Sequence, residues 1–155
     1  MRCLLILVLL QIFLMSFTFG SENNFTSPGN NNTRSNERTM KIKIGKSNFT
    51  AILYHNATAT AFASLLPLTV NMIDLNSNEK YIELSNRLPV DQSNPGTIQS
   101  GDLMLYGSST LVLFYKTFST SYSYTKLGRI NDIGGLAAAL GSGNVSVTYE
   151  LESQK

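Results

Sequence analysis

The sequence has one cysteine and one histidine among its 155 residues. A structural zinc site needs four Cys or His ligands and a disulfide framework needs paired cysteines, so we expect neither, and no metal or other cofactor. Charge is also scarce, because 14% of the residues are charged, whereas about 25% is usual. Twelve basic and ten acidic residues give a net charge of +2 without a basic stripe, so no nucleic-acid partner is expected.

What the chain has is apolar content and the length of a single domain. Hydrophobic residues make up 43% of it, which is enough to pack a core. Domains commonly contain about 100–150 residues, so a second core is not expected.

The first 20 residues have the layout of a secretory signal peptide. Arg2 precedes an apolar run from Leu4 to Phe19, and cleavage is expected after Gly20. We therefore expect an exported protein, secreted or periplasmic. The alternative is an uncleaved membrane anchor, because the run is near the minimum length that spans a bilayer.

Residues 21–39 are rich in Asn, Ser and Thr and have almost nothing to bury. Such a stretch does not offset the entropy cost of ordering it, which predicts a disordered tether. Asn24 and Asn31 in this tether are glycosylation acceptors if the source is a eukaryote. The compact domain is expected at 40–150, followed by a tail at 151–155.

Within the domain, alternation and turn residues predict short strands joined into hairpins. Lys41 and Lys43 alternate with Ile42 and Ile44, for example, and a Gly-containing turn follows. The expected strands lie at 40–44, 49–54, 68–72, 81–84, 103–106, 110–116, 124–130 and 145–149. Helices are expected at 57–66, capped by Asn56 and ended by Pro67, and at 136–140.

About eight antiparallel strands and only two short helices predict an all-β fold. A closed barrel removes the sheet edges, and the helices would then cap its open ends. An open β-sandwich is the alternative, because strand counting alone does not separate the two.

The motif Leu127-Gly128-Arg129-Ile130 is followed by a loop, a short helix and a closing strand. This order of elements resembles the end of the cyclophilin fold. Upstream, the run GDLMLYG at 101–107 and the pair Phe114-Tyr115 make residues 40–150 similar to small bacterial cyclophilin-like proteins. The resemblance implies a closed, antiparallel, eight-stranded barrel capped by two short helices, with a ligand-binding groove.

The resemblance also implies where the groove residues lie. Cyclophilins place an arginine on a strand beside the substrate, and Glu83 occupies that place here, an acceptor where catalysis needs a donor. Arg87 in the following loop is the candidate replacement. Phe114 is expected as a wall of the proline pocket, and Tyr124 falls near the position of the pocket histidine. We therefore predict a groove lined by Glu83, Arg87, Phe114 and Tyr124, without a catalytic residue.

Other chemically capable residues favour structural roles. His55 is expected to be a partly exposed loop residue, and Asp102 is expected either to cap a turn or to lie near Arg129. The six aromatic residues from Tyr106 to Tyr124 are expected to divide between the core and the outer face, and an aromatic ligand groove is the alternative.

Three functions remain open at this stage. The first is a secreted binding module that holds an extended peptide or a small apolar ligand without catalysis. The second is a prolyl cis-trans isomerase of low or altered activity, and the third is a structural scaffold without a ligand.

Overall fold

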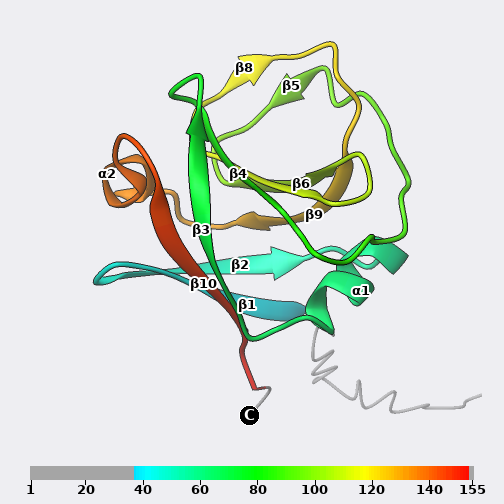
Figure 1. The fold of residues 1–155 in the computed structure, drawn as a ribbon, viewed down its shortest axis with the longest axis horizontal. Coiled ribbons are helices and arrows are strands. Elements are labelled where there is room, and N and C mark those ends of the chain that lie inside the picture. Colours follow the sequence, from blue (N-terminus) through cyan, green and yellow to red (C-terminus); the bar gives the residue numbers. More distant parts are fainter. Residues whose placement is uncertain (1–36, 154–155) are drawn as a thin grey trace, which may run out of the picture. The chain divides into compact units, whose positions relative to one another are not determined.

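The computed structural model describes residues 37–153 (Figure 1). The expected signal peptide, the acceptors Asn24 and Asn31, and the tether up to residue 36 lie outside the described residues. Strand β1 begins at Arg38, so Arg38 and Thr39 belong to the barrel and not to the tether. The reason is backbone pairing, because Arg38 lies opposite Leu53 and Thr39 opposite Ile52 on the next strand.

Ten strands and two helices follow one another along the described chain. They are β1 (Arg38–Ile44), β2 (Ser47–Leu53), α1 (Ala57–Ala63), β3 (Leu68–Leu75), β4 (Glu79–Glu83), β5 (Thr97–Ile98), β6 (Asp102–Tyr106), β7 (Thr110–Phe114), β8 (Phe118–Ser119), β9 (Thr125–Ile130), α2 (Leu136–Leu140) and β10 (Val145–Leu151). Neither helix is long and apolar enough to cross a membrane within residues 37–153.

Eight of the strands close into an antiparallel barrel. Their order around it is β1-β10-β3-β4-β7-β6-β9-β2, and β2 pairs with β1 to complete the circle. The closed barrel predicted from the sequence is confirmed, and the open sandwich is excluded. The remaining strands, β5 and β8, form a separate two-stranded ribbon that the sequence analysis did not predict.

The two helices close opposite ends of the barrel. Strands β3 and β10 are antiparallel, with Leu68 opposite Tyr149 and Met72 opposite Val145. Helix α1 leads into β3 and α2 leads into β10, so the helices must lie at opposite ends of this strand pair (Figure 1). Phe62 of α1 enters the core, where its ring packs edge-on against Tyr149 at 5.9 Å between centroids.

Helix α1 is shorter than the sequence predicts. Its start is as expected, because the Asn56 side chain accepts a hydrogen bond from the Ala59 amide at 2.7 Å. Its end is at Ala63 and not at residue 66. After Ala63 the chain makes a tighter turn, in which the Leu65 amide donates to the Phe62 carbonyl. The ring of Pro67 also disfavours helical geometry at the residue before it.

The barrel interior also holds a buried lysine. The side chain of Lys80 on β4 is completely buried, and its Nζ lies 2.6 Å from the Asp74 carboxylate. The same ammonium donates to the carbonyls of Gly141 and Gly143, just beyond α2, at 2.9 and 2.6 Å. Tyr115 donates its hydroxyl hydrogen to Asp74 at 2.7 Å. This network ties β3, β4 and the segment after α2 together.

Strands β6 and β7 are buried on both faces. Leu103, Leu105, Leu111 and Leu113 point into the barrel core. The alternate residues Met104, Val112 and Phe114 point outward into a second apolar cluster with Ile98, Tyr124 and Phe118. This outer cluster lies beneath the β5–β8 ribbon, and a cavity opens beside it.

Candidate functional site

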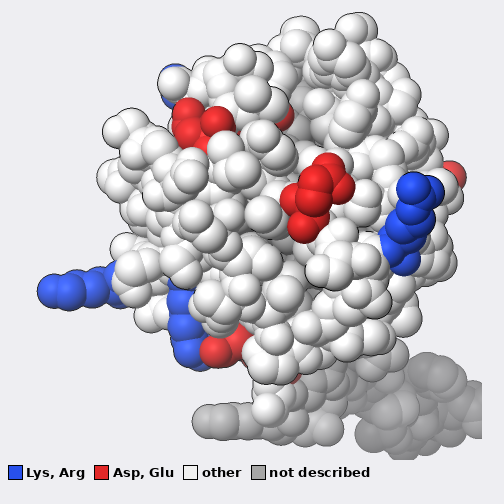
Figure 2. All heavy atoms as spheres, in the orientation of Figure 1, with Lys and Arg blue, Asp and Glu red and all other residues white. Residues whose placement is uncertain are grey.

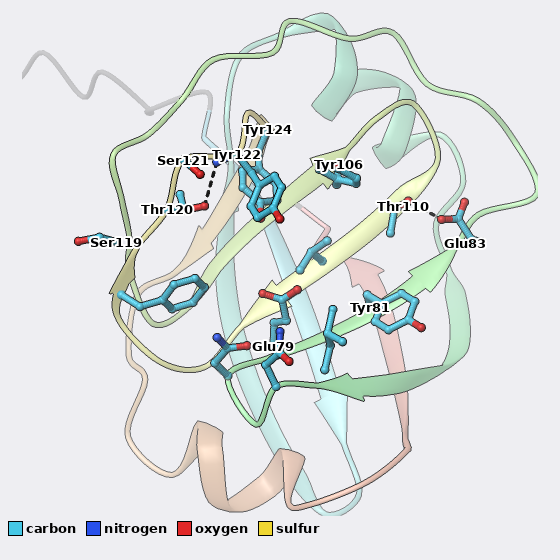
Figure 3. Close-up of a pocket in the computed structure, with 15 residues that line it drawn as sticks. Glu79, Tyr81, Glu83, Tyr106, Thr110, Ser119, Thr120, Ser121, Tyr122 and Tyr124 are labelled. Carbon is cyan, nitrogen blue, oxygen red and sulfur yellow. Dashed lines mark hydrogen bonds between the residues drawn. The ribbon is translucent and has the colours of Figure 1, made fainter.

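A cavity of about 560 Å³ lies on the outer face of the barrel, over β4 and β7 (Figure 3). Its walls come from the β3–β4 hairpin, from β4, β6 and β7, and from residues 118–124. The residues that line it are Leu75, Asn76, Asn78, Glu79, Tyr81, Glu83, Tyr106, Thr110, Val112, Phe118, Ser119, Thr120, Ser121, Tyr122 and Tyr124.

Strand periodicity explains which β4 side chains reach the cavity. Successive side chains of a strand point to opposite faces of the sheet. Lys80 and Ile82 face the barrel core, so Glu79, Tyr81 and Glu83 face outward and line the cavity. One short strand therefore supplies two carboxylates and an aromatic ring to the same site.

Three tyrosines form an aromatic wall at the other side of the cavity. The rings of Tyr106 and Tyr122 are 6.1 Å apart at an angle of 89°, and those of Tyr106 and Tyr124 are 5.6 Å apart at 54°. Phe114 supports this wall from below, 5.5 Å from Tyr124 and 5.8 Å from Phe118. The rings thus present faces in different directions around one space.

The segment that carries Tyr122 and Tyr124 is held by backbone hydrogen bonds to the long loop before β6. Ser93 and Tyr124 exchange two such bonds at 3.0 Å, and the Thr120 amide donates to the Gly96 carbonyl at 2.9 Å. The Thr120 hydroxyl accepts from the Tyr122 amide at 3.1 Å (Figure 3). The wall is therefore positioned before any ligand arrives.

The two carboxylates of the cavity have different surroundings. Glu83 is exposed at the edge of the site, where it accepts hydrogen bonds from Ser109 at 2.9 Å and from the Thr110 hydroxyl. Glu79 is partly buried, and its carboxylate points toward the side where Tyr122 and Tyr124 lie (Figure 3). Among residues 37–153, its carboxylate accepts no hydrogen bond and forms no ion pair.

Burial raises the pKa of Glu79, since loss of water disfavours its charged form. The pKa of Tyr124 is raised by its own burial first and then by the negative charge of Glu79. The pKa of Tyr115 is raised to about 12, chiefly by burial and further by the hydrogen bond to Asp74 and the charges of Asp74 and Glu79. Both tyrosines therefore remain neutral donors near pH 7.

The structure brings together only part of the predicted groove. Glu83 and Tyr124 line the cavity. Phe114 lies beneath it as a fully buried support and does not touch the open space. Arg87 is exposed in the loop after β4 and is not among the lining residues.

Sequence reasoning missed Glu79, Tyr81, Tyr106 and Tyr122 as site residues. A signal for two of them was present, because Glu79 and Tyr81 share a strand face with Glu83, which had been assigned to the groove. No comparable signal identifies Tyr106 and Tyr122, because their approach depends on how segment 118–124 folds back. The six aromatic residues from Tyr106 to Tyr124 do divide between the core, where Tyr115 packs, and the outer face, where four of them line the cavity.

The other candidates take structural roles away from the cavity. His55 is exposed, as predicted. Asp102 accepts a hydrogen bond from the Gln99 amide at 2.8 Å and lies 3.8 Å from Arg129, which confirms the predicted turn cap. In the described part of the chain, His, Cys, Asp and Glu do not gather in a group of three that could hold a metal ion.

Comparison with known proteins identifies a family and a solved structure of similar fold. The model of the cyclophilin-like family matches residues 42–150. No curated protein matches the chain. The solution structure of a hypothetical protein from Archaeoglobus fulgidus is similar, with a TM-score of 0.51 and 16% identity over 75% of this chain and 95% of that one. At this identity the likeness shows the fold alone.

Proposed function

The chain belongs to the cyclophilin-like family, and we propose that it is a binding module that holds its ligand in the outer-face cavity without isomerising X-Pro bonds. The observation that carries this proposal is the composition of the cavity. None of its 15 lining residues is Lys or Arg, and Glu83 occupies the place at which the family resemblance expects an arginine donor.

The chemistry of isomerisation explains why this matters. Rotation about a peptide bond has a barrier of about 18–20 kcal/mol. A preorganised donor lowers that barrier by bonding the twisting amide. A carboxylate that already accepts hydrogen bonds from Ser109 and Thr110 offers no such donor.

The cavity has the dimensions and mixed lining of a ligand pocket. Pockets for small molecules commonly measure about 300–1,000 Å³ and combine aromatic walls with a few polar groups. About 560 Å³ lined by tyrosines, two carboxylates and several hydroxyls fits this description. The ligand is a small molecule or one side chain of an extended peptide.

An isomerase assay on the full chain tests the absence of catalysis. We expect the rate for a proline-containing peptide to match that of buffer within a factor of about three, with a cyclophilin as positive control. Strong catalysis by the wild type that disappears in Arg87→Ala would overturn the proposal, because the missing donor would then lie in the loop.

Binding is tested by a ligand screen read through tyrosine ring resonances. Ligands should shift the signals of Tyr106, Tyr122 and Tyr124 and leave that of Tyr54, outside the cavity, in place. Ligands that shift Tyr54 alone would contradict the proposed site.

We also propose that the protein is exported, on the basis of the N-terminal sequence alone. N-terminal sequencing of the exported protein should then start near Ser21. Intact Met1 in a membrane fraction that resists carbonate washing would indicate an anchor instead.

A further inference from the structure

We infer that the ligand of the outer-face cavity carries a compact alkylammonium cation. This inference rests on the proposed binding function and adds the chemical class of the ligand. It follows from the charge of the lining, the unpaired state of Glu79 and the arrangement of the tyrosine rings.

The charge of the lining has one sign. Glu79 and Glu83 both line the cavity, and the 15 lining residues include no Lys, Arg or His. The hydroxyl and amide groups around them are neutral. Charged side chains are sparse on the described part of the face in Figure 2, and the net charge of the protein is +2, so an attraction for cations would come from the cavity and not from the protein as a whole.

Glu79 is a carboxylate without a protein partner. It is removed from much of the water around it, which raises its pKa, yet residues 37–153 provide neither a donor nor a cation for it. A buried charge is costly unless it is paired. A cationic ligand would recover most of this cost on binding, whereas a neutral donor would recover less and an anionic ligand none.

The nearest buried cation is already engaged. Lys80 follows Glu79 on β4 but points to the opposite face of the strand. Its ammonium lies 2.6 Å from Asp74 and donates to two backbone carbonyls. It therefore does not compete with a ligand for Glu79.

The aromatic wall suits an alkylated cation. A cation within about 6 Å of a ring centroid is attracted to the ring face. The ring centroid of Tyr106 lies 6.1 Å from that of Tyr122 and 5.6 Å from that of Tyr124. One ammonium can therefore lie within about 6 Å of more than one ring centroid. The apolar rim of an alkylammonium also packs against Leu75, Val112 and Phe118, which complete the lining.

Two sources carry this chemistry: a free alkylammonium compound and the lysine side chain of a peptide. Choline and N-acetyl-lysinamide serve as probes of the two. The neutral compound 3,3-dimethyl-1-butanol has nearly the shape of choline without its charge, so it isolates the contribution of the cation. All three are titrated into the full chain and followed by calorimetry and by the tyrosine ring resonances.

At least one cationic probe should bind about tenfold or more tightly than the neutral compound, which corresponds to about 1.4 kcal/mol. Glu79→Gln should remove most of this difference and leave the neutral compound unaffected. Glu150→Gln is the matched control, because Glu150 pairs with Lys43 on β1 and does not line the cavity. Tyr122→Ala should weaken the cationic probe without unfolding the protein, because Tyr122 is 62% exposed.

The outcomes separate this inference from the proposed function. The alkylammonium inference is wrong, while the binding module stands, if the neutral compound binds in the cavity as tightly as choline and N-acetyl-lysinamide. It is equally wrong if Glu79→Gln leaves the affinity for both cationic probes unchanged. If no probe shifts the resonances of the cavity tyrosines at a probe concentration of about 10 mM, the dissociation constants are too weak for a specific site, and the inference is also wrong. Failure of the proposed function is measured separately, by strong isomerase activity.

Discussion

Two glutamates four residues apart on β4 show how surroundings decide what a carboxylate can do. Glu83 has its hydrogen bonds supplied by Ser109 and Thr110 at the rim. Glu79 faces the aromatic wall without a partner, and burial raises its pKa. The first is a positioned acceptor, whereas the second is a charge for which a ligand is the available partner.

The raised pKa of Glu79 makes cation binding depend on pH. Choline keeps its charge at every pH, so a change in its affinity reports on the protein. The other titratable groups in the cavity are Glu83, Tyr81, Tyr106, Tyr122 and Tyr124, and Tyr115 and the Asp74–Lys80 pair lie behind Glu79. We expect choline affinity to fall as the pH drops through the pKa of Glu79, which burial raises above its ordinary value, and Glu79→Gln to flatten this part of the profile. A wild-type profile identical to that of Glu79→Gln would contradict the assignment.

Lys80 is the residue whose loss we expect to cost most stability. Lys80→Met would leave Asp74 with the Tyr115 hydroxyl but without its cation, and the carbonyls of Gly141 and Gly143 without their donor. Removing one member of a buried pair costs roughly 3–5 kcal/mol, so we expect a loss of about 3 kcal/mol in the free energy of unfolding. Urea denaturation measures it. Lys43→Met is the control, because the Lys43–Glu150 pair is exposed and should contribute about 1 kcal/mol or less. Equal losses in the two variants would refute this reading of the network.

The candidate site was only partly predictable from single residues. Glu83 and Tyr124 were assigned through their places in the resemblance, and both line the cavity. Phe114 was expected in the wall of the pocket but lies beneath it, fully buried. Sequence position does not show whether other residues cover an outward-facing aromatic side chain. Arg87 was assigned to the groove because a donor was missing there, but its side chain is exposed in the loop after β4 and does not line the cavity. The neighbourhood of Tyr106 and Tyr122 depends on tertiary folding that no local pattern encodes.

At the scale of strands, Gly128 explains part of the Leu127-Gly128-Arg129-Ile130 motif. A Cβ at this position would lie 2.4 Å from the Ile52 carbonyl oxygen and 3.2 Å from the Leu53 Cα, both on β2. Neither backbone atom can move without disturbing the β2–β9 pairing that closes the barrel. The glycine is therefore required by the close approach of two strands.

We expect Gly128→Ala to destabilise the protein by about 1–3 kcal/mol, the usual cost of forcing extra atoms into a packed site. The midpoint of thermal or urea unfolding measures it. Gly134→Ala is the matched control, since its Cβ would meet only the Asp132 side chain, at 3.0 Å, which can rotate away. A Gly128→Ala protein as stable as the control would show that β9 shifts freely.

The elements that the sequence predicted well are those with a complete local signal. The hairpins of the barrel have alternating residues and turn residues, and α2 lies between glycines at its predicted place. The β5–β8 ribbon was missed because each strand has two residues, too few for an alternation. The expected strand at 110–116 is two residues too long, because β7 ends at Phe114, beyond which the chain turns toward β8.

For the whole molecule, two carboxylates make stability depend on pH with opposite signs. Hydrogen bonds from Lys80 and Tyr115 lower the pKa of Asp74, so the unfolded chain takes up its proton first as the pH falls. Stability from Asp74 is therefore present above the ordinary aspartate pKa and is lost as the pH falls toward the lowered value. Glu79 acts in reverse, because its raised pKa means that protonation favours the folded state.

We expect the free energy of unfolding to decline below about pH 4, where unfolded aspartates begin to protonate. Asp74→Asn should lower stability at neutral pH and reduce this acid decline. Glu79→Gln should increase stability at neutral pH and leave the acid decline in place. Urea denaturation at several pH values measures both variants against the wild type. An acid decline in Asp74→Asn as steep as in the wild type would assign the loss to other carboxylates.

The closed barrel needs the chain only from β1 onward. Strand β1 pairs with β2 from Arg38 and with β10 from Met40, and the core residues lie between Met40 and Tyr149. We therefore expect a protein that lacks residues 1–36 to retain its free energy of unfolding within about 1 kcal/mol of the full chain.

A protein that lacks residues 1–39 should be less stable, because it loses the side chain of Arg38. That side chain donates to the Tyr54 carbonyl at 3.1 Å and to Thr60 at 3.0 Å, which ties β1 to α1. Urea denaturation of the two truncated proteins beside the full chain decides the point. A loss of more than about 1 kcal/mol on removal of residues 1–36 would mean that these residues pack against the barrel.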